Sequence, residues 1–393
     1  MQQSRREFVA GVGGVLVTSA LGRRTVVAQS PGMCAYVGSF ATPATPGTER
    51  KGINVFRVDP VSNRWTFVQQ LADFSMPNFL AFDRRQRYLY VAEGANREYA
   101  TAMSIDQRTG ELTVLNRQPT GGTSGMYAIV DPTNGYLIVP HVSGEIAVLP
   151  IRPDGSLAPM SDSATGTGKL GPHKPEQDTP TPHHVQFDRR GRFLLVPSRG
   201  YDAVYVFTLD TATGKLVANN PPSAGARSGA GPRHIGLHPT GPYAYVVNEL
   251  DSTVTTYRFD DQRGTLEPLQ VIPTTPTSFT GNNTGSEIVV AGSGRFVYAS
   301  NRGHDSVVIF AVEKSGVLAH VGWESTRGRT PRFIGFDPSE RFLYALNQGS
   351  NSIVAFRVNQ SSGALAPPNG LVAEVAAPTC VVFATPGATS SSR

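Results

Sequence analysis

Cysteine is nearly absent from this 393-residue chain, which contains only Cys34 and Cys380. Two cysteines cannot build a disulfide-rich scaffold or a four-cysteine zinc site, and no CxxC pair is present. The repeat register described below predicts that they are diagonal neighbours on adjacent strands, too far apart for a disulfide bond. We therefore expect two reduced core thiols, and a disulfide that closes the fold is the alternative.

Clusters of like charge are also missing. The 35 Lys and Arg residues and 30 Asp and Glu residues give a formal net charge of +5, and the basic residues are scattered along the chain. Nucleic-acid-binding proteins concentrate basic residues in patches or stripes, so we expect no nucleic-acid partner. The GxSxG and HExxH motifs are absent as well, which excludes the nucleophile-elbow hydrolases and the zincins.

No apolar run is long enough to span a bilayer. The short apolar segment that ends at Leu21 follows Arg5 and Arg6, which stand in a twin-arginine pattern. These flanks are typical of an export signal. We predict that residues 1–30 are a twin-arginine (Tat) signal cleaved near Ala28. The mature protein would then be periplasmic or secreted, without insertion into the membrane after cleavage.

The chain does contain a repeated unit of about fifty residues, present six times, with a seventh unit divided between the two ends. A proline or glycine opens each unit: Pro77, Gly125, Pro182, Pro232, Gly285 and Pro331. An aromatic or aliphatic residue follows 13 residues later: Tyr90, Ile138, Leu195, Tyr245, Tyr298 and Tyr344. A turn glycine closes the third segment of each unit: Gly110, Gly155, Gly214, Gly264, Gly316 and Gly363. A fixed period of this kind indicates a repeat architecture.

Each unit predicts four short strands. In the last complete unit, apolar runs at 333–336, 342–346 and 353–358 are separated by turn residues, and a weaker run follows Gly363. No long segment keeps the apolar period of a helix. Four strands in a unit of this length are typical of a blade of a β-propeller.

The two ends of the chain together supply one more blade. Segments 33–37, 53–58 and 65–71 correspond to three strands of a unit, and segment 378–383 corresponds to the missing first strand. We therefore predict an all-β, seven-bladed propeller over residues 31–386, closed by a blade that both termini share. Residues 387–393 are expected to be a disordered tail.

The repeat register also places polar residues at one rim. Because the first two strands of a unit form a tight hairpin, the start of the first and the end of the second lie at the same edge. Across the blades, the residue after the opener is Asn78, Met126, His183, Arg233, Ser286, Arg332 or Thr379. The residue that follows the second strand is Gly94, Val142, Arg199, Glu249, Arg302, Gln348 or Phe40. Several arginines around one carboxylate predict an anion-binding pocket at the mouth of the central channel.

Several strings resemble the lactonase family of seven-bladed propellers, which contains the propeller-type 6-phosphogluconolactonases and the fungal carboxy-muconate cyclase. They are Gly231-Pro232-Arg233-His234, Asn248-Glu249-Leu250, Ser286-Glu287-Ile288, Ala299-Ser300-Asn301-Arg302-Gly303 and Thr280-Gly281-Asn282-Asn283-Thr284. The resemblance extends over essentially the whole mature chain. In the cyclase branch a His, an Arg, a Glu and a second Arg are implicated in the site. By motif these correspond to His183 or its neighbour His184, Arg233, Glu249 and Arg302.

The predicted site has a catalytic group and a substrate-binding group. The expected catalytic residues are His183, Arg233, Glu249 and Arg302, and the expected substrate contacts are His184, Arg199, Asn301 and Arg332. Opening a lactone requires an activated water and a stabilised oxyanion. Glu249 or His183 would act as the base, and Arg302 and Arg233 would hold the oxyanion and the substrate's own carboxylate or phosphate.

Structural roles are the alternative at several of these positions. Arg233 and Glu249 come from paired strands of one blade, so they could form an ion pair that only stabilises the fold. His234 and Glu287 share a column of the repeat, and we expect them to be structural, with hydrogen bonds to the backbone across blades; support of the residues that contact the substrate is the alternative.

The predicted function is hydrolysis of a small, anionic or sugar-derived lactone by a monomer. Because the rim carries too few carboxylates for a Ca²⁺ site, we expect neither a metal nor another cofactor. Export separates the protein from cytoplasmic sugar phosphates, which favours a lactone other than 6-phosphogluconolactone. A non-catalytic propeller that binds a small ligand or a protein partner is one alternative, and a muconate-type cycloisomerase is another.

Overall fold

The computed structural model describes residues 32–40, 50–74, 76–94, 98–366 and 370–387, which belong to one compact unit. The predicted export signal at residues 1–30 lies outside the described residues, and so does the predicted tail apart from Gly387. The described part is all-β except for a single 3₁₀ turn, η1 (Gln348–Ser350). It contains no helix with the length and apolar character needed to cross a membrane.

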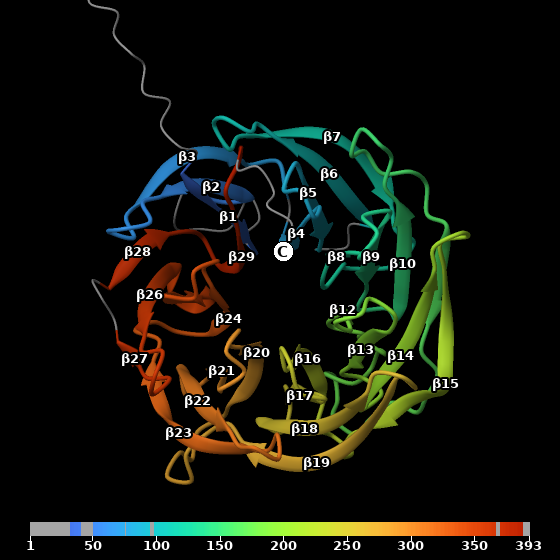
Figure 1. The fold of residues 1–393 in the computed structure, drawn as a ribbon, viewed down its shortest axis with the longest axis vertical. Helices are drawn as coiled ribbons and strands as arrows, with labels where there is room; N and C mark the ends of the chain where they lie inside the picture. The colour runs from blue at the N-terminus through green and yellow to red at the C-terminus, as the bar shows by residue number, and fades with distance from the viewer. Residues whose placement is uncertain (1–31, 41–49, 75, 95–97, 367–369, 388–393) are drawn as a thin grey trace, which may run out of the picture. The chain divides into compact units, whose positions relative to one another are not determined.

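Seven antiparallel sheets form the blades of a propeller, as predicted (Figure 1). The first strand of each blade lies nearest the axis: β29 (Pro378–Ala384), β4 (Pro77–Phe82), β8 (Ile129–Val130), β12 (Gln186–Phe187), β16 (Pro232–Leu237), β20 (Thr284–Val290) and β24 (Pro331–Phe336). The second strands are β1 (Met33–Ser39), β5 (Tyr88–Glu93), β9 (Tyr136–Pro140), β13 (Leu194–Ser198), β17 (Tyr243–Asn248), β21 (Phe296–Arg302) and β25 (Phe342–Asn347).

The two outer strands of each blade complete the sheets. The third strands are β2 (Ile53–Val58), β6 (Tyr99–Ile105), β10 (Glu145–Pro150), β14 (Ala203–Asp210), β18 (Thr253–Asp260), β22 (Ser306–Val312) and β26 (Ser352–Val358). The outermost strands are β3 (Trp65–Leu71), β7 (Leu112–Pro119), β11 (Asp162–Thr165), β15 (Lys215–Gly225), β19 (Thr265–Pro273) and β23 (Leu318–Ser325), with the short β27 (Leu365–Ala366) and β28 (Leu371–Glu374) both paired to β26.

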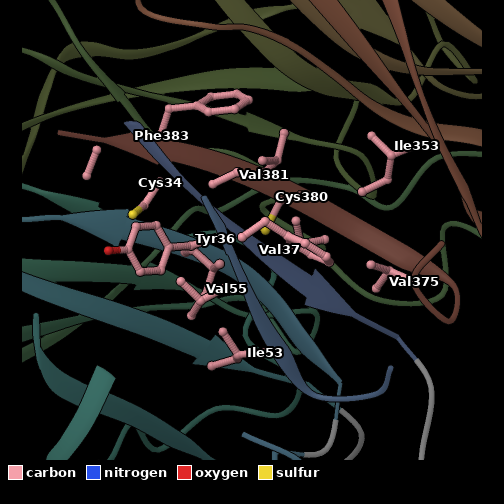
Figure 2. Close-up of a cluster of buried hydrophobic side chains, with 14 of the residues drawn as sticks. Cys34, Tyr36, Val37, Ile53, Val55, Ile353, Val375, Cys380, Val381 and Phe383 are labelled. Carbon is pink, nitrogen blue, oxygen red and sulfur yellow. The ribbon is translucent and has the colours of Figure 1, made fainter. Parts of the chain in front are cut away.

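Both ends of the chain contribute to one blade, in the strand order β29-β1-β2-β3. Its cysteines are free and buried. They are not the diagonal neighbours that the repeat register predicted, because Cys34 is paired with Ala384, four residues beyond Cys380. Four residues along a strand correspond to about 13 Å. Figure 2 shows the two sulfur atoms at separate points of this core, among Tyr36, Val37 and other apolar side chains.

The aromatic residue and the turn glycine of the repeat contact each other between neighbouring blades. The hydroxyl of Tyr245 donates a hydrogen bond to the carbonyl of Gly316 in the next blade, at 3.1 Å. Three other blades repeat this bond: Tyr36 to Gly110, Tyr90 to Gly155 and Tyr298 to Gly363. Gly316 has a φ of +85°, and a Cβ atom there would lie 2.3 Å from the ring of Tyr243. The fixed spacing in the sequence therefore reflects a fixed contact between blades.

A β-bulge follows the opener in most blades. The register shifts between Pro232 and His234, and equivalent shifts follow Pro77, Gly285 and Pro331. A bulge adds one residue to a strand and redirects its side chains. Consecutive residues at the start of an inner strand, such as Arg233 and His234, therefore line the same cavity instead of alternating between faces.

Candidate active site at one end of the axial channel

The starts of the inner strands surround a small cavity at one end of the axial channel. It measures about 10 Å³, which is room for one water molecule. Its lining contains Asn78, Phe79, Met126, His183, Arg233, His234, Glu287, Arg332, Phe333 and Thr379. Six of these belong to the column of residues after the openers. The seventh member of that column, Ser286, instead accepts a hydrogen bond from Arg233 Nη1 through its carbonyl oxygen at 2.8 Å.

Glu249 lies directly after β17, where three arginines from three blades meet its carboxylate. Arg233 Nε is 3.1 Å from Oε2, while Arg199 Nη1 and Arg302 Nη2 are 3.2 Å and 3.0 Å from Oε1. Burial alone would raise the pKa of Glu249, but these arginines hold it well below its ordinary value. Glu249 is therefore a permanent anion that organises the cluster, and its weak basicity favours another group as the base.

The structure also identifies the carboxylate partner of Arg302. Arg302 contacts Glu249 of the preceding blade and donates a second hydrogen bond to the carbonyl of Gly285 at 3.0 Å. Arg302 and Arg233 thus share the same carboxylate.

Arg332 differs from the other arginines of the site. Its guanidinium lies over the ring of Phe40 at 5.2 Å, and no carboxylate of the described residues lies within 4.0 Å of it. Burial and the nearby Arg302 lower the pKa of Arg332 to about 10, so it is still cationic at neutral pH. Arg332 is partly buried, and a partly buried cation without a carboxylate partner favours the binding of an anion.

A chain of three buried side chains ends at the cavity. His183 Nδ1 lies 3.1 Å from His234 Nε2, and His234 Nδ1 lies 2.7 Å from Glu287 Oε1. Burial and the neighbouring arginines hold the pKa of both histidines well below the ordinary value. Burial raises the pKa of Glu287 to about 7. The two histidines are therefore neutral, and His183 has a nitrogen, Nε2, without a hydrogen-bond partner in the described chain.

His184 and Asn301 lie outside the small cavity. The ring of His184 is stacked on His234 at 4.7 Å, and its Nδ1 accepts a hydrogen bond from the backbone of Ile235. The amide of Asn301 donates to the carbonyl of Thr274 at 2.8 Å and accepts from Asn283 at 3.0 Å. The polar atoms of Asn301 are thus occupied by contacts that hold loops in place.

A second, larger cavity occupies the rest of the channel. Its volume is about 760 Å³, and most of its lining is apolar, from Leu80 and Ile129 to Val289. The stacked rings of Phe79 and Tyr127, 3.6 Å apart, belong to its lining, and Phe79 also lines the small cavity. Glu287 is likewise shared by the two cavities.

Sequence reasoning underestimated His234 and Glu287. The sequence correctly placed them in one column of the repeat, two residues after the opener. They bond to each other through their side chains, rather than separately to backbone across blades. The signal that could have revealed this was two complementary polar residues at the same repeat position in adjacent blades.

No group of three His, Cys, Asp or Glu side chains in the described ranges has the arrangement of a metal site. The chemistry of the cluster is instead that of guanidinium, imidazole and carboxylate groups, which suits the binding of an anion and the transfer of a proton.

Comparison with known proteins gives a consistent result. A family model described as "Lactonase, 7-bladed beta-propeller" matches residues 34–383. A 6-phosphogluconolactonase of Bacillus subtilis is 36% identical over 311 residues, which cover 78% of this chain and 87% of that protein. A solved structure of the periplasmic gluconolactonase PpgL of Pseudomonas aeruginosa is 29% identical, with a TM-score of 0.81, and the match covers 90% of this chain and 99% of PpgL.

Proposed function

The chain belongs to the lactonase family of seven-bladed β-propellers, and from this premise we propose that it hydrolyses an anionic, sugar-derived lactone at the arginine-rich end of the channel. In this proposal the small cavity beside His183 holds the attacking water, and the anionic group of the lactone binds Arg332, which is partly exposed. The relatives support the reaction class, since the Bacillus subtilis protein is named a 6-phosphogluconolactonase and PpgL a gluconolactonase.

The charge of the site favours an anionic substrate. Glu249 is the shared partner of Arg199, Arg233 and Arg302, so their cluster keeps an excess of positive charge, and Arg332 adds a cation without a carboxylate partner among the residues described. A carboxylate or phosphate of the substrate would supply that partner, because a guanidinium binds two oxygens of such a group at once.

The proposed reaction uses His183 as a general base. Water adds through its oxygen to the carbonyl carbon of the lactone, while one of its protons moves to His183 Nε2. Arg233 and Arg302 stabilise the negative charge that develops on the carbonyl oxygen. The bond from that carbon to the ring oxygen then breaks, and the ring oxygen takes the proton from Nε2 and becomes a hydroxyl group.

The site of action is part of the proposal. We expect residues 1–30 to direct export, which would place the enzyme with exported or external lactones rather than with cytoplasmic sugar phosphates. PpgL is described as periplasmic, in agreement with this expectation. Fractionation of cells that express the full chain would check it, and a protein confined to the cytoplasm would contradict it.

A substrate screen tests the proposed activity directly. Purified protein would be assayed with glucono-1,5-lactone, its 6-phosphate and lactones of uronic and aldaric acids, and we expect the anionic lactones to be preferred. Arg332→Ala should lower kcat/KM for an anionic lactone by about 10- to 100-fold, with a smaller effect on a neutral lactone. Arg302→Ala should also depress turnover, with little change in Tm, because Glu249 keeps two other arginines.

The matched control is Arg357→Ala. Arg357 belongs to the same blade and also lies over a phenylalanine ring, Phe342, at 5.1 Å, but it is exposed on the third strand. This variant should hydrolyse lactones at the wild-type rate. Absence of turnover on every lactone would overturn the proposed function and favour a non-catalytic propeller. Equal effects of Arg332→Ala on neutral and anionic lactones would overturn the anionic substrate.

A further inference from the structure

We propose that Glu287 and His234 are positioning residues that form a proton relay with His183, which fixes the tautomer of His183 and connects the small cavity with the larger channel. This inference rests on the proposed function, since it assigns the groups that make His183 a base. It goes further by assigning a role to two buried residues that the proposed reaction does not yet use.

The geometry of the chain is that of a relay. Two short contacts, of 3.1 Å and 2.7 Å, link His183, His234 and Glu287, and each of the three residues is at most 5% exposed. The ring of His234 is held from two sides, by the parallel ring of His184 at 4.7 Å and the perpendicular ring of Tyr127 at 5.6 Å. His234 therefore has little freedom to break either hydrogen bond by rotation.

The protonation state of Glu287 determines the direction of both hydrogen bonds. An ionised Glu287 accepts a bond from Nδ1–H of His234, so Nε2 of His234 has no proton and accepts from Nδ1–H of His183. Nε2 of His183 is then a free base. A protonated Glu287 donates to His234 Nδ1 and reverses both bonds, which places a proton on His183 Nε2 and removes the base.

Nearby charges favour a relay that works without charging the histidines. The titratable and charged groups that face it from the packed elements are Arg199, Arg233, Glu249, Arg302, Arg332, His184 and Tyr127. Burial and the excess of arginines keep the pKa of His183 and His234 low, whereas burial raises the pKa of Glu287 to about 7. The carboxyl group is thus the member of the chain that takes up or releases a proton near neutral pH.

The relay also gives the reaction a route for its proton. Hydrolysis of a lactone yields a carboxylic acid, which ionises, so one proton per turnover must leave the site. During the addition of water, His183 accepts a proton at Nε2 and passes its Nδ1 proton to His234, which passes its own Nδ1 proton to Glu287. The same shifts in reverse return the Nε2 proton to the ring oxygen and restore the base, and the proton of the carboxylic acid leaves with the product. Glu287 borders the large channel as well as the small cavity. Its Oε2 atom is buried without a hydrogen-bond partner among the described residues, which leaves this oxygen available to a proton.

The test combines kinetics with a measurement that needs no activity. In wild-type protein labelled with ¹⁵N-histidine, at about pH 8.5, His183 should be the Nδ1–H tautomer. In Glu287→Gln the amide can donate to His234, and we expect the tautomers of both histidines to change. The kcat of Glu287→Gln should fall by about 10- to 100-fold, with KM changed less than about threefold, and the rise of kcat with pH near 7 should disappear.

Two further variants keep the test informative. Glu313→Gln, on an exposed turn of the same blade, should leave the kinetics and the spectra unchanged. Glu287→Asp keeps the carboxylate and should retain a titrating pH profile, even if Glu287→Gln folds poorly. Unchanged histidine tautomers in Glu287→Gln would overturn the relay. So would altered tautomers together with wild-type kcat and pH dependence. If wild-type protein opens no lactone, the proposed function fails, whereas the spectra still decide whether the three residues are coupled.

Discussion

The two ends of the inner strands differ sharply in chemistry although the same seven strands form both. At their starting end, charged and polar side chains line a small cavity of about 10 Å³. Farther along the strands, mainly apolar side chains such as Leu80 and Val289 line a cavity of about 760 Å³. The anionic substrate that we propose would therefore bind beside the smaller of these two cavities.

This difference between the two ends separates the repeat positions that are kept in every blade from those that vary. In the apolar part, each blade presents similar residues, as a repeated scaffold requires. At the strand starts the equivalent position changes completely, from Met126 to His183 to Arg233 in successive blades. We therefore propose that function resides where the repeat is broken, whereas the repeated positions build the scaffold. Three predictions test this separation.

The largest effect is expected at the polar end, from Glu249→Gln. This change removes the only carboxylate that contacts Arg199, Arg233 and Arg302 within the described residues. Removing one partner of a buried ion pair costs about 3–5 kcal/mol, because the other charges lose their compensation. We expect a loss of about 3 kcal/mol or more in the free energy of unfolding, measured by urea denaturation, together with loss of lactone hydrolysis.

A control on the same blade isolates the cluster. Glu267 is exposed on β19, and Glu267→Gln should change stability by less than about 0.5 kcal/mol. Inorganic sulfate should stabilise Glu249→Gln more than wild type, because an anion replaces the missing carboxylate. A destabilisation below about 1 kcal/mol would show that the charges at this end do not depend on Glu249.

The same separation explains what the sequence could predict. Constant spacing predicted the seven blades, because the bond from Tyr245 to Gly316 and its equivalents require that spacing. The position after each opener predicted which side chains share the rim. The ion pair of Arg233 with Glu249 was one of the alternatives that the sequence offered. The other partners were not predictable, since bulges such as the one after Pro232 break the alternation of faces. The bond from His234 to Glu287 and the pairing of Arg302 with Glu249 both depend on such local geometry.

An intermediate effect is expected from Glu287→Gln, at the junction of the two cavities. Burial raises the pKa of Glu287 from 4.5 to about 7 in the folded protein. The stability that its proton contributes is complete below pH 4.5 and is lost as the pH rises through 7. Glutamine does not titrate. Relative to wild type, the variant should therefore gain about 2 kcal/mol in free energy of unfolding between pH 5 and pH 8.

The measurement is a urea denaturation series over that pH range for both proteins. His183, His184 and His234 have lowered pKa values and destabilise the fold as the pH falls. They are present in both proteins, so their contribution largely cancels in the comparison. A constant difference between variant and wild type from pH 5 to pH 8 would mean that Glu287 has an ordinary pKa, and burial would then not disfavour its ionised form.

The smallest effect is expected at the roomy end, from Val289→Thr. Val289 follows Glu287 by two residues on β20 and lines the large cavity, where it is partly exposed. Threonine has nearly the same shape, and its hydroxyl can reach water in the channel, so the loss of stability should stay below about 1 kcal/mol. Turnover of the best lactone should remain within about twofold of wild type, because general acid–base chemistry depends on groups within hydrogen-bond reach of the reacting atoms.

A tenfold loss of kcat without loss of Tm would mean that the apolar cavity takes part in catalysis. The substrate would then extend through the channel past Glu287, and the separation of a functional end from a structural end would be wrong.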